Sequence, residues 1–136
     1  MESTGLKQIL IVDDEPMLRE SLAERFEISG YATQTAGSAD EAMSILVSGQ
    51  FDVLITDVNM PGGTGYDLVG LTRFVDGKIP VILISGNDDE ELMAAQSNGS
   101  KVFCCLSKPI DTEALFKAVE EAIDQNTGDE AEMAVA

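Results

Sequence analysis

Three runs of consecutive apolar residues constrain the fold of this chain more than any other feature. They are ILIV at 9–12, DVLIT at 52–56 and PVILIS at 80–85. A strand with one face in water alternates apolar and polar side chains, whereas a strand covered on both faces is apolar at successive positions. The runs therefore predict a parallel sheet with helices on both of its faces.

Strands and helices are expected to alternate along the whole chain. The expected strands are 8–12, 31–35, 53–56, 81–85 and 102–106, and the expected helices are 15–29, 39–47, 66–74, 88–96 and 111–123. Right-handed crossovers fold this order into a doubly wound α/β fold, (βα)5, with a five-stranded parallel sheet. Apolar periodicity ends at about Gln125, so we expect one domain at 7–124 and an acidic, disordered tail at 125–136.

Residues with special backbone chemistry mark several helix ends. Ser38 and Glu41 form the pattern of a capping box before the second helix. Gly30, Gly77 and Gly99 fall where helices are expected to stop, because glycine readily adopts the left-handed conformation that ends a helix.

Composition excludes several classes of function. The chain has 25 acidic and 8 basic residues, a net charge of −17, and no histidine. Without a basic cluster, direct binding to nucleic acid or to an anionic membrane is disfavoured. The lack of histidine excludes Ser-His-Asp and Cys-His catalysis and a phosphohistidine donor.

The sequence also indicates the compartment. No segment has the ~20 apolar residues of a membrane span, and the first residues lack the pattern of a signal peptide, so a cytoplasmic location is expected. Cys104 and Cys105 lie in an apolar run and indicate small hydrophobic side chains in a reducing compartment.

Polar residues gather where the strands end. Asp13 and Asp14 follow the first strand, Asp57 the third, Ser85 the fourth, and Lys108 the fifth. Functional groups of parallel α/β sheets collect at this edge. Clustered carboxylates need a compensating cation, and an oxygen-rich site suits Mg²⁺. An aspartate facing a metal and a lysine can act as a nucleophile toward phosphorus, which assigns that role to Asp57.

Each of these residues has an ordinary structural interpretation. Asp13 and Asp14 could cap the first helix, Asp57 could be a turn residue, and Lys108 could be a solvated cation. Ser85 could be only a hydroxyl at a strand end. Their joint occurrence at the same end of consecutive strands favours a functional site.

Four segments carry a specific family resemblance. ILIVDDEP, LITDVNMPGGTGYDL, VILISG and LSKPI resemble, in order and spacing, the receiver domains of two-component response regulators, over roughly residues 7–124. The resemblance implies the flavodoxin-like, CheY-like receiver fold. It also implies a phosphorylation-dependent signalling switch that is not an enzyme but assists its own phosphorylation and autodephosphorylation.

The resemblance assigns a metal and phosphoryl site. It implies that Asp57 accepts a phosphoryl group from a histidine kinase or phosphotransfer protein. Asp14 and Asp57 would bind Mg²⁺ directly, Asp13 through water, and Asn59 through its main-chain carbonyl.

The resemblance also assigns a switch. Ser85 would be the switch hydroxyl, and Lys108 would pair with the phosphoryl group, before a Lys108–Pro109 bond that is usually cis in the family. The face formed by the fourth helix, fifth strand and fifth helix would bind a downstream protein. One position departs from the pattern of the family, because Cys105 stands where many receivers have a Tyr or Phe. Phe103 shares the face of Cys105 only if no bulge intervenes.

Other functions remain as alternatives. A pseudo-receiver would keep the fold without phosphorylation. A haloacid-dehalogenase-like phosphatase needs a second aspartate where Asn59 stands, and an amide cannot exchange a proton in that role. A flavodoxin-like FMN carrier would place phosphate where Asp13, Asp14 and Glu15 repel it. No output domain is visible after Ile123, so the chain is either a single-domain regulator or an excised piece of a larger protein.

Overall fold

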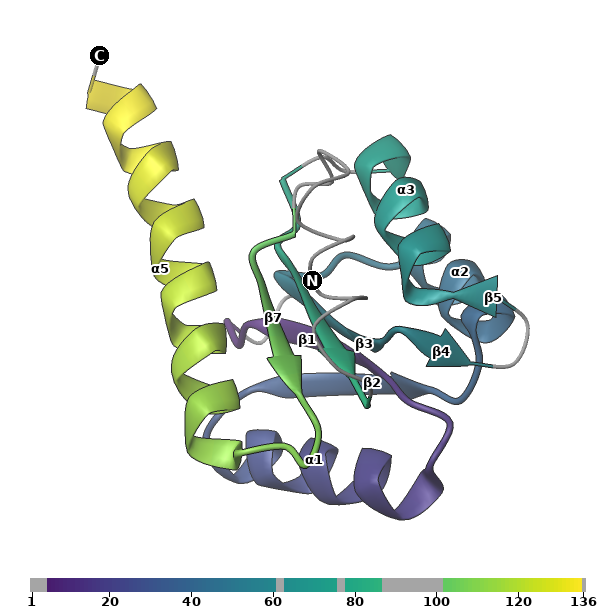
Figure 1. Cartoon of the computed structure of the whole chain (residues 1–136). Helices are drawn as coiled ribbons and strands as arrows, with labels where there is room; N and C mark the ends of the chain where they lie inside the picture. Colours follow the sequence, from purple (N-terminus) through teal and green to yellow (C-terminus); the bar gives the residue numbers. More distant parts are fainter. Residues whose placement is uncertain (1–4, 61–62, 76–77, 87–101, 136) are drawn as a thin grey trace.

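The protein is described by a computed structural model, which covers residues 5–60, 63–75, 78–86 and 102–135. Figure 1 shows the main, five-stranded sheet between two layers of helices. The strands of the sheet are β1 (Gln8–Val12), β2 (Ala32–Ala36), β3 (Val53–Asp57), β6 (Val81–Ser85) and β7 (Cys104–Ser107). The helices are α1 (Pro16–Ile28), α2 (Ala39–Ser48), α3 (Gly65–Val75) and α5 (Thr112–Val135). The doubly wound α/β prediction is confirmed.

The sheet has the order β2-β1-β3-β6-β7, and every neighbouring pair is parallel. All five residues of β3 and of β6 are buried. The two edge strands, β2 and β7, are mostly half-buried. The consecutive apolar runs therefore mark the central strands, as expected for strands with helices on both faces.

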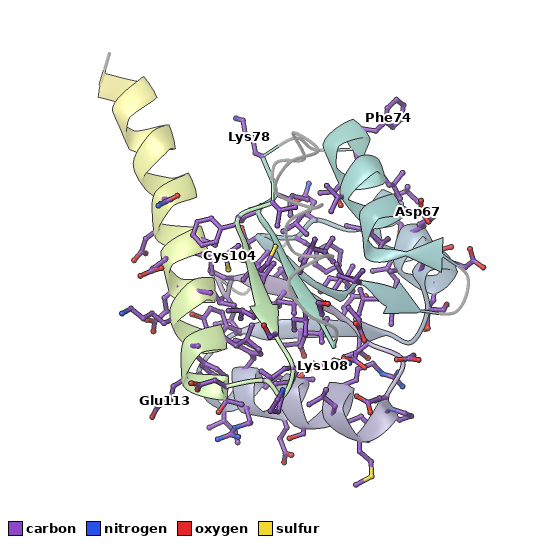
Figure 2. All side chains as sticks on the ribbon, in the orientation of Figure 1. Asp67, Phe74, Lys78, Cys104, Lys108 and Glu113 are labelled. Carbon is purple, nitrogen blue, oxygen red and sulfur yellow. The ribbon has the colours of Figure 1, made fainter. Side chains whose placement is uncertain are left out.

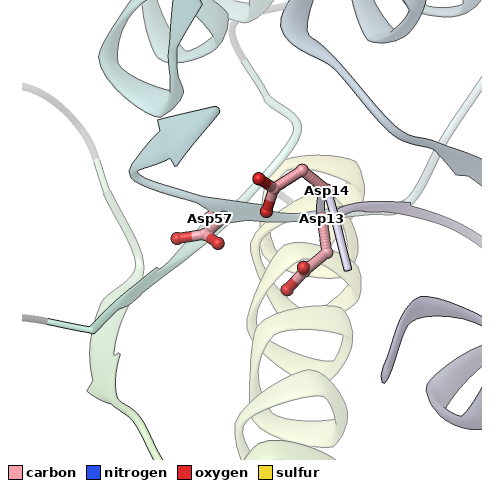
Figure 3. Close-up of side chains that lie close together, drawn as sticks. All are labelled: Asp13, Asp14 and Asp57. Carbon is pink, nitrogen blue, oxygen red and sulfur yellow. The ribbon is translucent and has the colours of Figure 1, made fainter. Parts of the chain in front are cut away.

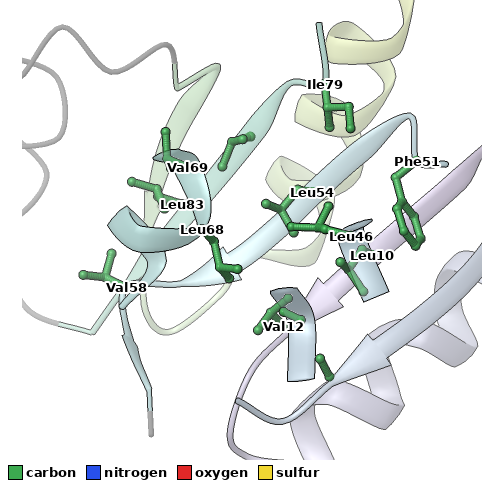
Figure 4. Close-up of a cluster of buried hydrophobic side chains, with 13 residues drawn as sticks. Leu10, Val12, Leu46, Phe51, Leu54, Val58, Leu68, Val69, Ile79 and Leu83 are labelled. Atoms are coloured by element: carbon green, nitrogen blue, oxygen red, sulfur yellow. The ribbon is translucent and has the colours of Figure 1, made fainter. Parts of the chain in front are cut away.

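Side chains of each central strand divide between two cores. One core packs Leu10, Leu54 and Leu83 against α2 and α3 (Figure 4). The other packs Ile11, Ile55 and their neighbours against α1 and α5. Successive side chains along each central strand therefore point into opposite cores. Because both faces are buried, no polar residue interrupts the apolar runs.

The end of α1 shows how glycine chemistry sets an element boundary. Gly30 has a φ of 102°, and its amide donates to the Glu27 carbonyl. The Tyr31 amide donates to the Phe26 carbonyl, and the two rings meet edge to face. These contacts form a Schellman motif with its hydrophobic contact, so the predicted stop at Gly30 is confirmed.

The predicted capping box at α2 is partly confirmed. The Glu41 amide donates to the Ser38 hydroxyl at 3.2 Å, so Ser38 is the N-cap. The Glu41 carboxylate accepts from the Gly37 amide at 2.9 Å, one residue earlier than the capping-box pattern requires.

Two elements differ from the prediction. A short antiparallel ladder of β4 (Asn59–Met60) and β5 (Gly63–Thr64) follows Asp57, where only a turn was expected. Helix α5 continues through Val135, so its expected end at Ile123 is wrong. Figure 1 shows that α5 extends beyond the sheet, so the apolar stripe that packs on the sheet does not mark the end of this helix.

The expected helix 88–96, and Gly77 and Gly99, lie outside the described residues. The division into a domain at 7–124 and a tail at 125–136 stays a prediction. Within the described ranges, no helix is both long enough and apolar enough to cross a membrane.

Candidate functional site

Strand register brings the predicted site residues to one edge of the sheet. Val12 of β1 pairs with Thr56 of β3, so Asp57, the last residue of β3, lies beside Asp13, the first residue after β1. Ser85 pairs with Ser107, the last residue of β7, so Lys108 follows directly beyond that pair. Parallel strands all end on the same side, which is why groups distant in sequence meet here.

The three predicted metal-binding acids form one cluster (Figure 3). Asp13, Asp14 and Asp57 each place a carboxylate oxygen within 4.8 Å of those of the other two. Asp13 is 2% exposed and Asp57 is 5% exposed, whereas Asp14 lies at the surface. The cluster therefore has a buried floor and one open side.

Lys108 is the cation that enters this cluster in the described structure. Its Nζ donates to Asp57 Oδ2 at 2.9 Å and lies 3.9 Å from Asp13 Oδ2. Glu15 Oε1 lies 3.6 Å from the same Nζ. One ammonium group thus faces three acids, and Figure 2 shows it at the end of β7.

Burial and charge act in opposite directions on these groups. Burial raises the pKa of Asp13, more than the amide of Glu15 and the charge of Lys108 lower it. Burial alone lowers the pKa of Lys108, but the hydrogen bond to Asp57 and the acids around it outweigh burial, and its pKa is raised. The raised pKa of Asp13 means that Lys108 does not fully compensate the buried negative charge.

The residues present fit a divalent cation. Three carboxylates with one open side supply the hard oxygen ligands that Mg²⁺ prefers, and the open side leaves room for the waters that it usually keeps. The incompletely compensated charge at Asp13 would be reduced by a second cation.

The helix-capping interpretation of the first two acids is wrong for the described geometry. Glu15 is the N-cap of α1, and no side chain caps it. The Asp13 carboxylate instead accepts from the Glu15 amide at 2.8 Å, in the loop before the helix.

Ser85 and Gly86 lie beside Lys108. Ser85 is fully buried, and its main-chain carbonyl accepts from the Lys108 amide at 2.8 Å. A Cβ added at Gly86 would lie 3.6 Å from Lys108 Cδ, an ordinary contact. The Lys108–Pro109 peptide bond is cis, as the resemblance implied.

Asn59 lies in β4, two residues after Asp57, and its main chain pairs with Thr64. The role of the Asn59 carbonyl as a metal ligand stays a prediction.

Phe103 does not share the face of Cys105. Phe103 packs in the core between the sheet and α1 and α5, together with Cys104. Cys105 packs in the opposite core, beside Val102. Alternation holds only within β7, which begins at Cys104 and not at Val102 as predicted, so Phe103 lies before the regular strand.

Both cysteines are free thiols and half-buried. Burial, with smaller effects from Cys105 and Glu121, raises the pKa of Cys104 to about 11. Burial also raises the pKa of Cys105. The thiols face opposite cores, with Cys104 between β7 and α5 (Figure 2), and they serve as packing groups, as predicted.

Two contacts at the site were not predicted. Glu15 reaches Lys108, and Arg19 donates from Nη1 to the Asp13 main-chain carbonyl at 2.8 Å. Glu15 follows the two acids directly in sequence, whereas Arg19 is the fourth residue of α1 and reaches the site only through the fold. A helix that starts beside the acidic loop was the signal that could have indicated Arg19.

Comparison with known proteins identifies the family. The family model for the response regulator receiver domain matches residues 9–120. The transcriptional regulatory protein GlrR of Escherichia coli (strain K12) is 33% identical over 119 residues, which cover 87% of this chain and 26% of GlrR. The chain thus spans about a quarter of the length of that relative.

Solved structures show the same fold. A CheY-like receiver domain protein from Methanospirillum hungatei JF-1 superposes with a TM-score of 0.86 at 23% identity, covering 92% of this chain and 99% of the other. The response regulator TrrA of Thermotoga maritima, in complex with Mg²⁺-BeF, gives a TM-score of 0.74 at 30% identity, covering 86% and 99%.

This chain belongs to the receiver domain family of two-component response regulators. Phosphorylation-dependent switching is the standard function of the family, whose members generally are not enzymes in the ordinary sense. Receiver domains typically bind Mg²⁺ at an acidic pocket and interact with histidine kinases and downstream effectors.

Proposed function

We propose that Asp57 accepts a phosphoryl group from a histidine kinase or phosphotransfer protein in the presence of Mg²⁺. The observation that carries this proposal is the pairing of Asp57 with Lys108 at 2.9 Å inside a cluster of three acids. An isolated turn aspartate would have neither partner. The domain is proposed to span 7–124, and its location to be cytoplasmic.

The chemistry follows from the contacts of Asp57. One carboxylate oxygen forms a bond to phosphorus while the bond from phosphorus to the donor atom breaks, and the donor atom leaves with the electron pair. Lys108 Nζ already lies against Asp57 Oδ2, where it can pair with an oxygen of the incoming group. The pair is 24% and 7% exposed at its side chains, so solvent screens it only partly.

The proposed metal ligands are Asp14, Asp57 and the Asn59 carbonyl, with Asp13 acting through water. Mg²⁺ bound there would neutralise charge on the phosphoryl oxygens. The buried position of Asp13 and its bond from the Glu15 amide hold that carboxylate in one orientation.

Phosphorylation adds up to about two negative charges and three strong acceptors at Asp57. Ser85 and Lys108 are the proposed responders, and they are already linked through their main chains. A changed position of Lys108 acts directly on β7 and on the start of α5. We propose that this side of the molecule, with the fourth helix, binds a downstream protein. The acidic chain favours protein contact over direct contact with nucleic acid or membrane.

Intact-mass analysis after incubation with acetyl phosphate tests the proposal. We expect the mass gain of one phosphoryl group, dependent on Mg²⁺ and absent in Asp57→Asn. Asp52→Asn is the matched control, because Asp52 directly precedes β3 and accepts from the Gln8 amide at 2.8 Å, away from the cluster. This variant should gain the group as the wild type does.

The same experiment separates the main alternative. A pseudo-receiver would gain no phosphoryl group with any donor and would not respond to Mg²⁺. Mass gain that persists in Asp57→Asn would place the acceptor elsewhere and contradict the proposed role of Asp57.

A further inference from the structure

Asp13 is held from three sides by hydrogen bonds. Its amide donates to the Ala36 carbonyl at 3.1 Å, which joins it to the end of β2. Its carboxylate accepts from the Glu15 amide at 2.8 Å. Its carbonyl accepts from Arg19 Nη1 at 2.8 Å, which joins it to α1. The Arg19 bond is the one of the three that depends on a long side chain.

The loop after β2 is shaped around the same guanidinium group. A Cβ added at Gly37 would lie 2.8 Å from Arg19 Nη1, closer than real Cβ contacts. The φ of Gly37 lies outside the left-handed region, so the backbone itself does not require glycine there. The missing side chain at Gly37 therefore leaves the space that Arg19 occupies.

Arg19 acts on the main chain and not on the acids. Among the described residues it forms no ion pair with a carboxylate, and its hydrogen bond goes to the Asp13 carbonyl. A guanidinium group is planar and always charged, and it presents several donors in a fixed geometry, so it can orient a loop well. The hydrogen bond joins α1 to the loop that carries Asp13 and Asp14.

We infer that Arg19 is a positioning residue for the proposed metal and phosphoryl site, and that the absence of a side chain at Gly37 allows the guanidinium group to take its observed position. The inference rests on the proposed function, because it concerns the same acidic cluster. Arg19 would hold the Asp13–Asp14 turn so that both carboxylates face Asp57. Residues that orient metal ligands without touching the metal typically change metal affinity 10–100-fold when they are replaced.

Calorimetric titration with Mg²⁺ alone tests the inference. We expect Arg19→Met to weaken Mg²⁺ binding by about tenfold or more. Arg19→Lys, which keeps one ammonium donor, should recover part of this loss. Gly37→Ala keeps Arg19 but displaces it, so it should weaken binding in the same direction.

A double-mutant cycle separates positioning from general damage. Because Arg19 and Gly37 act through one contact, Arg19→Met combined with Gly37→Ala should bind Mg²⁺ no more weakly than Arg19→Met alone. Arg25→Met is the matched control, since Arg25 lies in the last turn of the same helix. It should leave Mg²⁺ affinity unchanged. Urea unfolding without Mg²⁺ should give Arg19→Met and Arg25→Met similar stabilities.

Phosphorylation gives a second readout. Saturating Mg²⁺ should restore the phosphoryl gain of Arg19→Met, since Asp57 and its contacts remain. Wild-type Mg²⁺ affinity in Arg19→Met, or additive losses in the double variant, would overturn the positioning role while leaving Asp57 as the acceptor. A wild-type protein that neither binds Mg²⁺ nor gains a phosphoryl group would instead overturn the proposed function.

Discussion

The centre of the sheet and its β7 edge contribute to the site in different ways. Strands β1 and β3 are buried on both faces and carry the acids Asp13 and Asp57. Strand β7 is half-buried, and the residue after it, Lys108, supplies the positive charge of the site. The acids are therefore held at the ends of strands that are buried on both faces, whereas the cation follows a half-buried edge strand.

The largest expected effect is on the free energy of unfolding, and it distinguishes two leucines on neighbouring strands. Leu83 of β6 is fully buried, whereas Leu106 of β7 is half-buried. Leu83→Ala should lower the free energy of unfolding by about 2–5 kcal/mol, as expected for a cavity in a packed core. Leu106→Ala should lower it by clearly less. Urea denaturation of both variants measures the difference, and equal losses would contradict the distinction between centre and edge.

A medium effect is expected at the other edge, where Gly30 leads into β2. Gly30→Ala forces a Cβ into a left-handed conformation with a φ of 102°. It should lower stability by about 1 kcal/mol. Gly70→Ala in α3 is the matched control, because a Cβ there meets open space and alanine favours a helix. In thermal unfolding, the midpoint temperature of Gly30→Ala should lie below that of the wild type, and that of Gly70→Ala should lie above it.

Replacing Asp13 is expected to have a smaller effect, and it should raise the stability of the protein instead of lowering it. The pKa of Asp13 is raised in the folded protein, so its contribution to stability is present below the unfolded pKa of 3.8 and is lost as pH rises through the folded pKa. Asp13→Asn, without Mg²⁺, should therefore be more stable than the wild type at neutral pH. Unfolding at pH 3 and pH 7 checks this, and a variant that is less stable at both would refute it.

The smallest effect concerns Lys108 at alkaline pH. The pKa of Lys108 is raised in the folded protein, so the stability that it contributes is present below the unfolded pKa of 10.5 and is lost as pH rises through the folded pKa. Lys108→Met should lack this alkaline loss. Lys117→Met, on α5, serves as the control, and denaturant midpoints measured below pH 10.5 and at increasing pH above it compare the two.

Local patterns predicted those parts of the molecule whose causes are local. Strands β1 and β6 have the predicted bounds, 8–12 and 81–85, and Gly30 ends α1 through a motif of neighbouring residues. The end of α5 at Val135 could not be predicted from such a pattern. An apolar stripe marks the part of a helix that packs on the sheet and does not mark the length of the helix.

The candidate site was predictable as a set of residues but not as a set of contacts. Asp13, Asp14, Asp57, Ser85 and Lys108 were expected at one edge because parallel strands end together. The sides taken by Phe103 and Cys105 were not predictable, because they depend on where β7 begins.

The order of strands and helices, the burial of the sheet on both faces and the acids at its carboxyl edge can be predicted from the amino-acid sequence. They follow from side-chain periodicity and from the positions of charged residues along the chain. The contact of Lys108 with Asp57, and the position of Arg19 beside Gly37 with its hydrogen bond to the Asp13 carbonyl, arise only in the folded protein. Those contacts join residues from different elements, so they depend on strand register and helix placement, which no local pattern encodes.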